Sequence, residues 1–307
     1  MHVYSIPMRA RFRGITQRTG LLFEGPAGWG EFCPFEEYGD DEAMAWLACA
    51  LEAANEGWPA PLRDRIPVNC TVPVVSPERA HEIVARSGCS TAKVKVAEST
   101  LADDCARLEA VRDALGPAGF VRIDANMMWD VDTAVTAIKA MDKSAGGLQY
   151  VEQPCHTLDE LAAVRRRVAV PIAADESIRK ADDPLKVAVS GAADIAVIKV
   201  APLGGVRKAL EVAEACGLPC VVSSALETSV GMAAGVALAA ALPELDYACG
   251  LATLSLLDGD VTSDSLTPVD GYLPVLTKSP VPDRIAEFET GDQAWVERFQ
   301  RVRQSLS

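Results

Sequence analysis

The stretch FVRIDAN, residues 120–126, decides the fold, because it is a short apolar segment that ends in a carboxylate, Asp124. Two similar segments follow it, LQYVE ending at Glu152 and PIAAD ending at Asp175. Lysines occupy the same kind of position on either side of the three acids: Lys93 and Lys95 in AKVKV, and Lys199 after DIAVI. A parallel barrel gathers the carboxyl ends of its strands around one opening, so we expect these charges to share one pocket.

Short apolar segments alternate with helical patterns from residue 68 onward. Strands are expected at 68–72, 92–96, 119–124, 148–152, 171–175, 194–199, 219–223 and 247–251, and helices between them at 77–86, 101–115, 133–141, 158–167, 205–216 and 229–242. This alternation predicts an α/β fold, a (β/α)7β TIM-type barrel. An open doubly wound sheet has the same alternation, but no GxGxxG follows the first strand.

The two ends of the chain differ in pattern from the barrel segment. Apolar and polar residues alternate through 3–12, which predicts an antiparallel ribbon, and a helix is expected at 40–54. We therefore predict three parts: a small α+β capping domain at 1–65, the barrel domain at 66–266, and a C-terminal segment at 267–307. The last segment is expected to pack on the cap or the barrel and so complete the capping domain.

Composition limits the classes of partner and compartment. The 307 residues carry a net charge of −14, which argues against nucleic acid, because a phosphate backbone is bound through clustered Lys and Arg. The longest apolar run, 230–242, would span about 20 Å as a helix, too short for a bilayer. Nine cysteines without CxxC spacing and a start without an apolar signal core favour a reducing, cytoplasmic location. Both a monomer and an oligomer are compatible with this pattern.

The three carboxylates offer hard oxygen ligands of the kind that Mg²⁺ prefers, with Mn²⁺ as a possible substitute. Zinc is disfavoured, because the chain has three histidines and no cysteine at a matching strand end. Any one of these acids alone could instead cap the helix that follows it. The three acids together with the lysines make a metal site the better interpretation.

The lysines predict acid/base chemistry. Lys93 and Lys95 lie two residues apart on a strand and share a face, so each disfavours the other's charge and one can become a general base. Lys199 would approach from across the barrel mouth. Removing a proton next to a carboxylate builds negative charge on neighbouring oxygens, which a cation can offset. Surface lysines paired with acids are the alternative, but two lysines inside an apolar strand argue against it.

Several motifs carry a family resemblance over nearly the whole chain: GWGEFCPF (28–35), KVK (93–95), DAN (124–126), EQP (152–154), DES (175–177) and SSALETS (223–229). The chain resembles the enolase superfamily and, within it, the o-succinylbenzoate synthases of menaquinone biosynthesis. The resemblance implies Mg²⁺-dependent dehydration of a small-molecule carboxylate, 2-succinyl-6-hydroxy-2,4-cyclohexadiene-1-carboxylate, to o-succinylbenzoate.

The resemblance also implies roles for individual residues. The metal ligands would be Asp124, Glu152 and Asp175. Lys95 would remove the proton and then protonate the departing hydroxyl, with Lys199 as a cation against the enolate and Lys93 tuning Lys95. The pocket would be lined by Asn126, Ser223, Ser224 and Gly250, and the helix start after strand seven would face the succinyl carboxylate.

Other reactions of the superfamily are weighed on the same residues. No histidine follows strand seven, which argues against a mandelate-racemase-like site, and CGLAT (249–253) replaces the Asp-x-Asp expected of a dipeptide epimerase. An N-acylamino acid racemase and a muconate-type cycloisomerase stay open, because both use the same lysine pair. A barrel that binds a ligand without catalysis is the alternative outside the enzymes.

Overall fold

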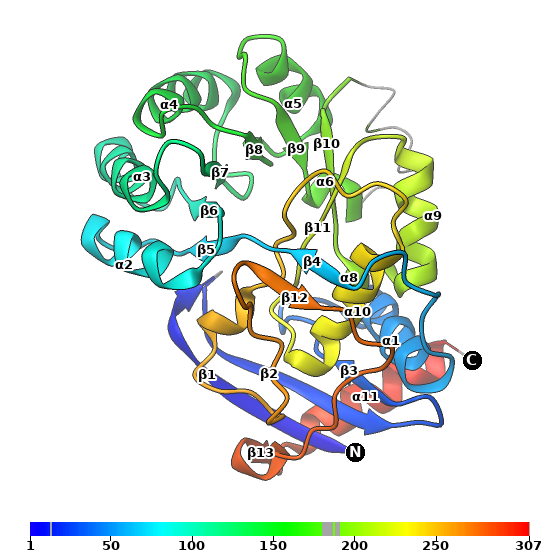
Figure 1. Cartoon of the computed structure of the whole chain (residues 1–307). Coiled ribbons are helices and arrows are strands. Elements are labelled where there is room, and N and C mark those ends of the chain that lie inside the picture. Colours follow the sequence, from blue (N-terminus) through cyan, green and yellow to red (C-terminus); the bar gives the residue numbers. More distant parts are fainter. Residues whose placement is uncertain (13, 180–186, 188–190, 307) are drawn as a thin grey trace.

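A computed structural model describes residues 1–12, 14–179, 187 and 191–306 (Figure 1). The N-terminal part forms an antiparallel sheet of β1 (His2–Phe12), β2 (Ile15–Glu24) and β3 (Trp29–Phe32), and β13 (Glu289–Thr290) pairs with β1 at its edge. Two helices, α1 (Asp40–Asn55) and α11 (Gln293–Ser305), pack with this sheet. Phe32 on β3 makes edge-on contacts with Trp295 and Phe299 of α11. The C-terminal segment thus completes the cap.

Seven parallel strands form the curved sheet of the barrel, in the order β11-β10-β9-β8-β7-β6-β5. They are β5 (Cys70–Val72), β6 (Thr91–Lys95), β7 (Phe120–Asp124), β8 (Tyr150–Glu152), β9 (Ile172–Ala174), β10 (Ile195–Ile198) and β11 (Cys220–Val222). Each lies within one of the first seven predicted ranges or begins one residue before it. The predicted α/β barrel fold with a small cap is confirmed.

The eighth predicted strand, 247–251, is shorter than expected. It is reduced to two parallel bridges, Val68 with Cys249 and Ser223 with Gly250, which join the two edges of the sheet and close the barrel. The carbonyl of Ala248 accepts a hydrogen bond from Arg122 Nη1 at 2.7 Å. A side chain from inside the barrel therefore binds the backbone just before these two bridges.

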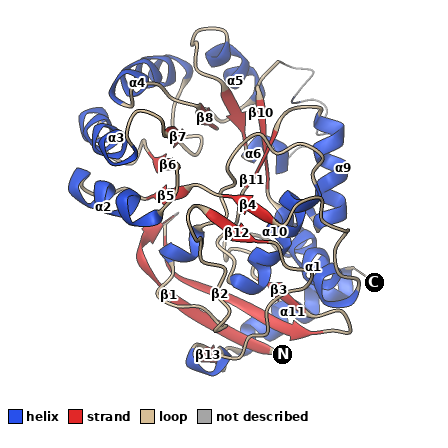
Figure 2. Cartoon of the chain, viewed as in Figure 1, coloured by secondary structure: helices blue, strands red, loops and turns tan. Residues whose placement is uncertain are grey.

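The helices cover the outside of the barrel (Figure 2). They are α2 (Pro77–Ser87), α3 (Leu101–Leu115), α4 (Val131–Ser144), α5 (Leu158–Arg165), α9 (Val206–Cys216) and α10 (Ser229–Ala241). Two short helices, α6 (Glu176–Arg179) and α8 (Val200–Leu203), follow β9 and β10 at the mouth of the barrel. Most of the longer ones begin where a Ser, Thr or Asp side chain accepts a backbone N–H of the first turn: Ser76, Thr100, Asp130, Thr157 and Thr228. These local signals explain why the predicted starts lie close to the observed ones.

Shorter elements connect the two parts of the molecule. A two-stranded sheet of β4 (Arg65–Pro67) and β12 (Tyr272–Pro274) leads into β5, and two 3₁₀ turns, η1 (Thr253–Leu256) and η2 (Ile285–Glu287), follow the barrel. In the described part of the chain, no helix combines the length and the apolar character that crossing a bilayer requires. The domain boundaries at 65 and 266 stay a prediction.

The barrel interior has its own small core, separate from the large core that includes the helices. Its buried members are Tyr150, Ala173, Ile195, Val197 and Val221, with Tyr247 packed against them. Arg122 is fully buried beside them, with its guanidinium 4.7 Å from the centre of the Tyr150 ring. Side chains alternate across a strand, so Asp124 lies on the same face as Arg122 and nearer the carboxyl end. The charged layer of the mouth thus lies above a packed apolar and aromatic layer.

Candidate active site

Strand register explains how the charged residues come together. In the pairing of β6 with β7, Lys95 lies opposite Asp124, and in the pairing of β7 with β8, Asp124 lies opposite Glu152. Asp175 comes one residue after β9, and Lys199 one residue after β10. Because neighbouring parallel strands end at the same edge, residues far apart in sequence occupy one layer.

Each carboxylate of this layer is held by a lysine. Lys95 Nζ lies 2.5 Å from Asp124 Oδ2, and Lys93 Nζ donates to both oxygens of Glu152 at 3.0 Å. Lys93 Nζ is also 3.6 Å from Asp124 Oδ2. Lys199 Nζ donates to Asp175 Oδ2. Lys93 and Lys95 therefore form a connected set of ion pairs with Asp124 and Glu152, and Lys199 forms a second ion pair with Asp175.

Burial makes these charges interact strongly. Asp124, Glu152 and Asp175 are at most 2% exposed. Burial opposes the charge of Asp124, but Lys95 and Lys93 outweigh it and hold the pKa of that carboxyl well below its usual range. Burial raises the pKa of Glu152 to about 7; Lys93 opposes this rise, and repulsion from Asp124 and Asp175 adds to it. The acids thus repel one another, which is the repulsion that a shared divalent cation would remove.

Lys93 itself is held in the charged form. Burial disfavours its ammonium group, but the attraction of Glu152 and Asp124 is larger and raises the pKa of Lys93 above its ordinary value. Lys93 and Lys95 both contact the same oxygen, Asp124 Oδ2, at 3.6 and 2.5 Å. This contact is consistent with the tuning role that the sequence suggested for Lys93.

The chemistry of the donor set fits a hard cation. The acids of the layer offer only carboxylate oxygens, which suit Mg²⁺ or Mn²⁺ better than zinc. Among the described residues, no three His, Cys, Asp or Glu side chains are grouped as they would be around a metal ion. The carboxylates form ion pairs with the lysine ammonium groups instead. Three features support Asp124, Glu152 and Asp175 as the ligands. All three are carboxylates, they lie at the ends of adjacent strands, and their negative charges repel one another.

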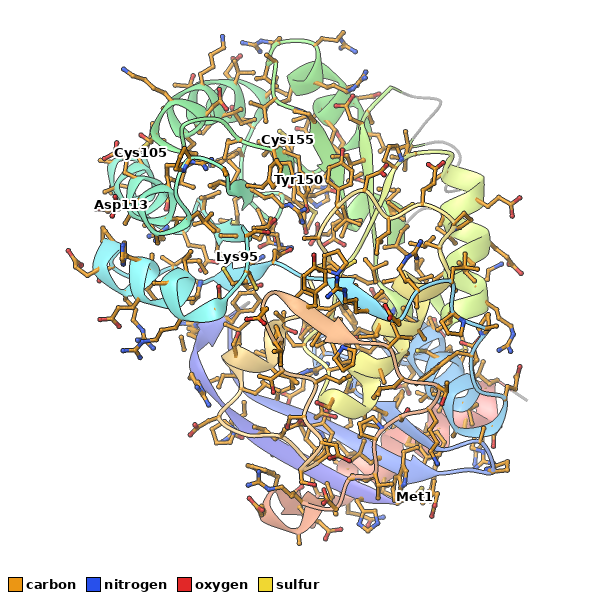
Figure 3. All side chains as sticks on the ribbon, viewed as in Figure 1. Met1, Lys95, Cys105, Asp113, Tyr150 and Cys155 are labelled. Carbon is orange, nitrogen blue, oxygen red and sulfur yellow. The ribbon has the colours of Figure 1, made fainter. Side chains whose placement is uncertain are left out.

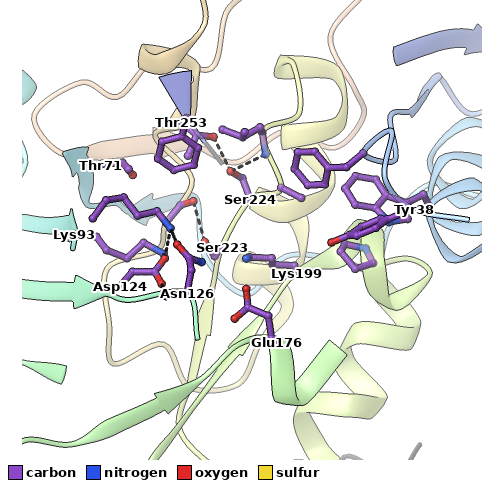
Figure 4. A pocket seen from close by; sticks show the side chains of 18 residues that line it. Tyr38, Thr71, Lys93, Asp124, Asn126, Glu176, Lys199, Ser223, Ser224 and Thr253 are labelled. Atoms are coloured by element: carbon purple, nitrogen blue, oxygen red, sulfur yellow. Dashed lines mark hydrogen bonds and ion pairs between the residues drawn. The ribbon is translucent and has the colours of Figure 1, made fainter. Parts of the chain in front are cut away.

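A pocket with an empty volume of about 560 Å³ opens over this layer. The predicted residues that line it are Lys93, Lys95, Asp124, Asn126, Lys199, Ser223, Ser224 and Gly250. Figure 4 places Lys93, Asp124 and Asn126 on one side and Lys199 with Glu176 on the other. Glu152 and Asp175 do not line the pocket; they lie beneath its wall, where Lys93 and Lys199 contact them.

The four predicted substrate-binding residues make specific local contacts. Asn126 has φ +43°, its N–H donates to Asp124 Oδ1 at 3.1 Å, and its side-chain oxygen accepts from Lys95. The Ser224 hydroxyl lies 2.6 Å from that of Thr253, and the Ser223 hydroxyl lies 3.5 Å from the carbonyl of Gly250. Asn126 thus orients Lys95, the candidate base. Ser223 and Ser224 form part of the pocket wall.

The helix start after β11 does not face the substrate as expected. The N–H groups of Thr228 and Gly231 donate to Glu31 at 3.0 and 2.8 Å, and that of Ser229 donates to Asp260 at 3.2 Å. Because carboxylates of the protein already bind these groups, they cannot also bind a succinyl carboxylate. The expectation that the start of α10 binds the succinyl carboxylate is therefore wrong. The sequence does not reveal that Glu31 of the cap reaches this helix start.

Sequence reasoning missed the aromatic roof of the pocket. The cap contributes Phe12, Phe35, Tyr38 and Trp46 to the lining. The Phe12 ring lies 5.1 Å from Lys95 Nζ, close enough for the ring face to attract the ammonium. Phe35 does end the GWGEFCPF motif, but no pattern in the sequence gives the angle at which the cap meets the barrel.

Arg18 joins this roof to the barrel. It is 2% exposed, and its guanidinium lies 4.5 Å from the centre of the Phe35 ring. Its Nε donates to Leu226 O at 2.9 Å and its Nη2 donates to Ala225 O at 3.1 Å. The loop after β11 is thereby fixed against the cap.

Comparisons with known proteins agree with this architecture. The family model described as "Enolase C-terminal domain-like" matches residues 76–280, and that described as "Enolase N-terminal domain-like" matches residues 3–54. Among solved structures, the L-Ala-D/L-Glu epimerase from Bacillus subtilis is similar with a TM-score of 0.75 and 26% identity, covering 91% of this chain and 95% of that one. A muconate lactonizing enzyme from Pseudomonas fluorescens has a TM-score of 0.81 at 21% identity, covering 94% and 97%.

Curated relatives are similar over almost the full length. The o-succinylbenzoate synthase of Thermobifida fusca is 64% identical over 98% of this chain and 95% of its own. That of Mycolicibacterium smegmatis is 56% identical over 97% of this chain and 93% of its own. With a family model that covers most of the chain and relatives of this identity, the protein belongs to the enolase superfamily.

Proposed function

We propose that this protein is a carbon–oxygen lyase that dehydrates 2-succinyl-6-hydroxy-2,4-cyclohexadiene-1-carboxylate to o-succinylbenzoate. The observation that carries the proposal is the 64% identity, over 98% of the chain, with a relative of that activity. Structures that share the fold at lower identity include an epimerase and a lactonizing enzyme, so the fold alone does not choose the reaction.

The lysines supply the proton transfers. Lys95 in its neutral form takes the proton from the ring carbon that bears the carboxylate. The same group, now an ammonium, gives a proton to the hydroxyl that leaves the neighbouring carbon, so water departs and the ring becomes aromatic. Asp124 and the Asn126 side-chain oxygen orient Lys95 through their contacts with Nζ. Lys93 contacts the same Asp124 oxygen at 3.6 Å and donates to Glu152 at 3.0 Å, so it helps to position the acids around Lys95.

The remaining residues hold charge in place. A divalent cation would be bound by Asp124, Glu152 and Asp175 and would supply positive charge against the substrate carboxylate as the proton leaves. Lys199 approaches from the other side of the pocket and stabilises the same developing negative charge. The aromatic roof excludes water from the lysines.

The test is direct. Purified protein is mixed with the diene and Mg²⁺, and the absorbance of the diene is followed over time. We expect a rapid loss that EDTA abolishes and excess Mg²⁺ restores. No loss, or a loss that is indifferent to EDTA, would contradict the proposal.

A second activity, racemisation of an N-acylamino acid, is favoured by one observation: Lys199 lies across the pocket from the β6 side that carries Lys93 and Lys95. Two bases on opposite faces of a carbon can remove and return its proton. In D₂O this reaction would incorporate α-deuterium from either enantiomer. A panel of acylated amino acids that shows no exchange would contradict this second activity.

A further inference from the structure

Leu226, in the loop between β11 and α10, has a backbone conformation that its residue type disfavours. Its φ is +66°, in the left-handed region, where a leucine is strained because its side chain cannot hydrogen-bond locally as that of Asn or Asp can. Leu226 is 3% exposed and, together with Ala225, lines the active-site pocket. Strained backbone persists only where the surrounding structure holds it. Contacts at the pocket wall must therefore stabilise this conformation.

Arg18 of the cap supplies such contacts. Its Nε donates to Leu226 O at 2.9 Å and its Nη2 to Ala225 O at 3.1 Å. Nη2 also donates to the Cys33 carbonyl, so one planar guanidinium joins the cap to two consecutive carbonyls of the loop. Because Arg18 is 2% exposed, water does not compete for these bonds, and each buried carbonyl would lose this donor if the side chain were changed.

The conformation of Leu226 in turn fixes a hydroxyl of the pocket. The Leu226 N–H donates to Ser224 Oγ at 3.4 Å, and that hydroxyl lies 2.6 Å from the Thr253 hydroxyl (Figure 4). Ser224 and Thr253 both line the pocket, whereas Arg18 does not. The two peptide groups that flank Leu226 thus connect Arg18, behind the wall, with the Ser224 hydroxyl in the wall. Arg18 can therefore act on a substrate only through this loop.

We propose that Arg18 is a positioning residue that holds Leu226 in its left-handed conformation and thereby shapes the pocket wall of residues 224–226 for the substrate. Without the bonds from Arg18, the loop would adopt the binding conformation for only a fraction of the time, and the apparent affinity would fall in proportion to that fraction. The candidate base Lys95 is oriented by Asp124 and Asn126 instead, so the proton transfers should be preserved. The kinetic part of this inference rests on the proposed dehydration.

The first test is the variant Arg18→Lys. Lysine keeps the buried positive charge but lacks the planar fork that reaches three carbonyls at once. In steady-state kinetics with the diene, we expect KM to rise about tenfold while kcat stays within about twofold of the wild type. An unchanged KM, or a fall in kcat alone, would contradict the proposal.

Substitutions of Leu226 separate positioning from a merely structural role of Arg18. Leu226→Gly and Leu226→Ala both remove the side chain, but only glycine adopts φ +66° without strain. Combining Arg18→Lys with Leu226→Gly should change KM by less than about threefold relative to Leu226→Gly alone, whereas combining it with Leu226→Ala should still raise KM about tenfold relative to Leu226→Ala alone. Equal changes in the two combinations would show that Arg18 does not act through the backbone of Leu226.

Folding of these variants is informative as well. If Arg18→Lys does not fold, Leu226→Gly should restore a cooperative unfolding transition and Leu226→Ala should not, because only glycine relieves the strain. An unfolded double variant with glycine would count against the proposal.

Hydrogen exchange measured by mass spectrometry gives a readout that does not depend on turnover. In Arg18→Lys, the amides of residues 224–226 should exchange at least about tenfold faster than in the wild type. Unchanged exchange would contradict the positioning role. If exchange rises but the wild-type protein does not convert the diene, the positioning role stands and the proposed dehydration is what fails.

The matched control is Arg112→Lys on α3. Arg112 also donates to several backbone carbonyls, those of Gly116 at 3.1 Å, Gly119 at 2.6 Å and Gly147 at 3.2 Å, and none of these residues lines the active-site pocket. Figure 3 places the neighbouring Asp113 on the outside of the barrel, away from Met1 of the cap. The control should leave both KM and the exchange of residues 224–226 unchanged. The same changes in both variants would show that the effect is not specific to Arg18.

Discussion

The interface between cap and barrel and the mouth of the barrel both contain buried carboxylates, and different groups neutralise them. At the interface, Glu31 on β3 accepts hydrogen bonds from the Tyr4 hydroxyl at 2.6 Å and from backbone N–H groups at the start of α10. Glu52 on α1 accepts from the N–H groups of Val206 and Arg207 at the start of α9. Helix starts carry unpaired N–H groups and a favourable dipole, so each acid fixes a barrel helix to the cap.

The mouth has the opposite arrangement. Asp124, Glu152 and Asp175 are neutralised mainly by lysine ammonium groups at the ends of long side chains. A backbone N–H cannot move or change its charge, whereas an ammonium group can do both. A buried acid held by helix amides thus serves stability, whereas a buried acid held by lysines is available for chemistry. Four substitutions test this division.

The largest effect is expected for Lys95→Ala. Without the proposed base, turnover of the diene should fall about 10³-fold while the unfolding transition is preserved. Steady-state kinetics and thermal unfolding measure the two quantities. The control is Lys208→Ala, because Lys208 is 62% exposed and forms an ion pair with the exposed Glu211; its turnover should not change. Normal turnover in the Lys95 variant would remove this lysine from the mechanism.

The next effect is on metal affinity. Replacing a charged ligand by an amide in Glu152→Gln should weaken Mg²⁺ or Mn²⁺ binding by about 10- to 100-fold, measured by titration calorimetry. Glu31→Gln is the matched control at the interface and should leave the affinity unchanged. Equal metal affinity in the two variants would show that the division between the regions does not hold.

Stability should respond in the other region. Glu31→Gln removes the charge that several buried donors share, so the free energy of unfolding should fall by about 2–3 kcal/mol in urea denaturation. Glu42→Gln, at an exposed position on the same side of the molecule, should change it by less than about 0.5 kcal/mol. An unchanged unfolding midpoint for Glu31→Gln would mean that the cap does not depend on this acid.

The smallest effect concerns pH. Burial raises the pKa of Glu227 above its usual 4.5, although the Ala225 N–H donates to its side chain at 2.7 Å. A raised folded-state pKa gives stability that is present below pH 4.5 and is lost as the pH rises through the raised value. Glu227→Gln should therefore reduce the fall in unfolding free energy above pH 4.5, measured by denaturation at several pH values. Identical slopes for variant and wild type would contradict this.

Several elements were predictable because their signals are local. Helix α3 lies at Leu101–Leu115 as predicted, since Thr100 caps its start and apolar residues recur along it. The end of β7 at Asp124 and of β8 at Glu152 followed from short apolar runs that end in an acid. The eighth strand was overestimated, because the sequence does not show that Arg122 takes the carbonyl of Ala248.

The sequence by itself determined the order of strands and helices, the acids and lysines at the strand ends, and hence which residues meet in one layer, because period and register are local properties of the chain. Only the tertiary structure decided the aromatic roof and the occupation of the α10 helix start by Glu31. These features depend on how separate elements dock, and docking is set by the sum of many weak packing contacts that no short pattern records.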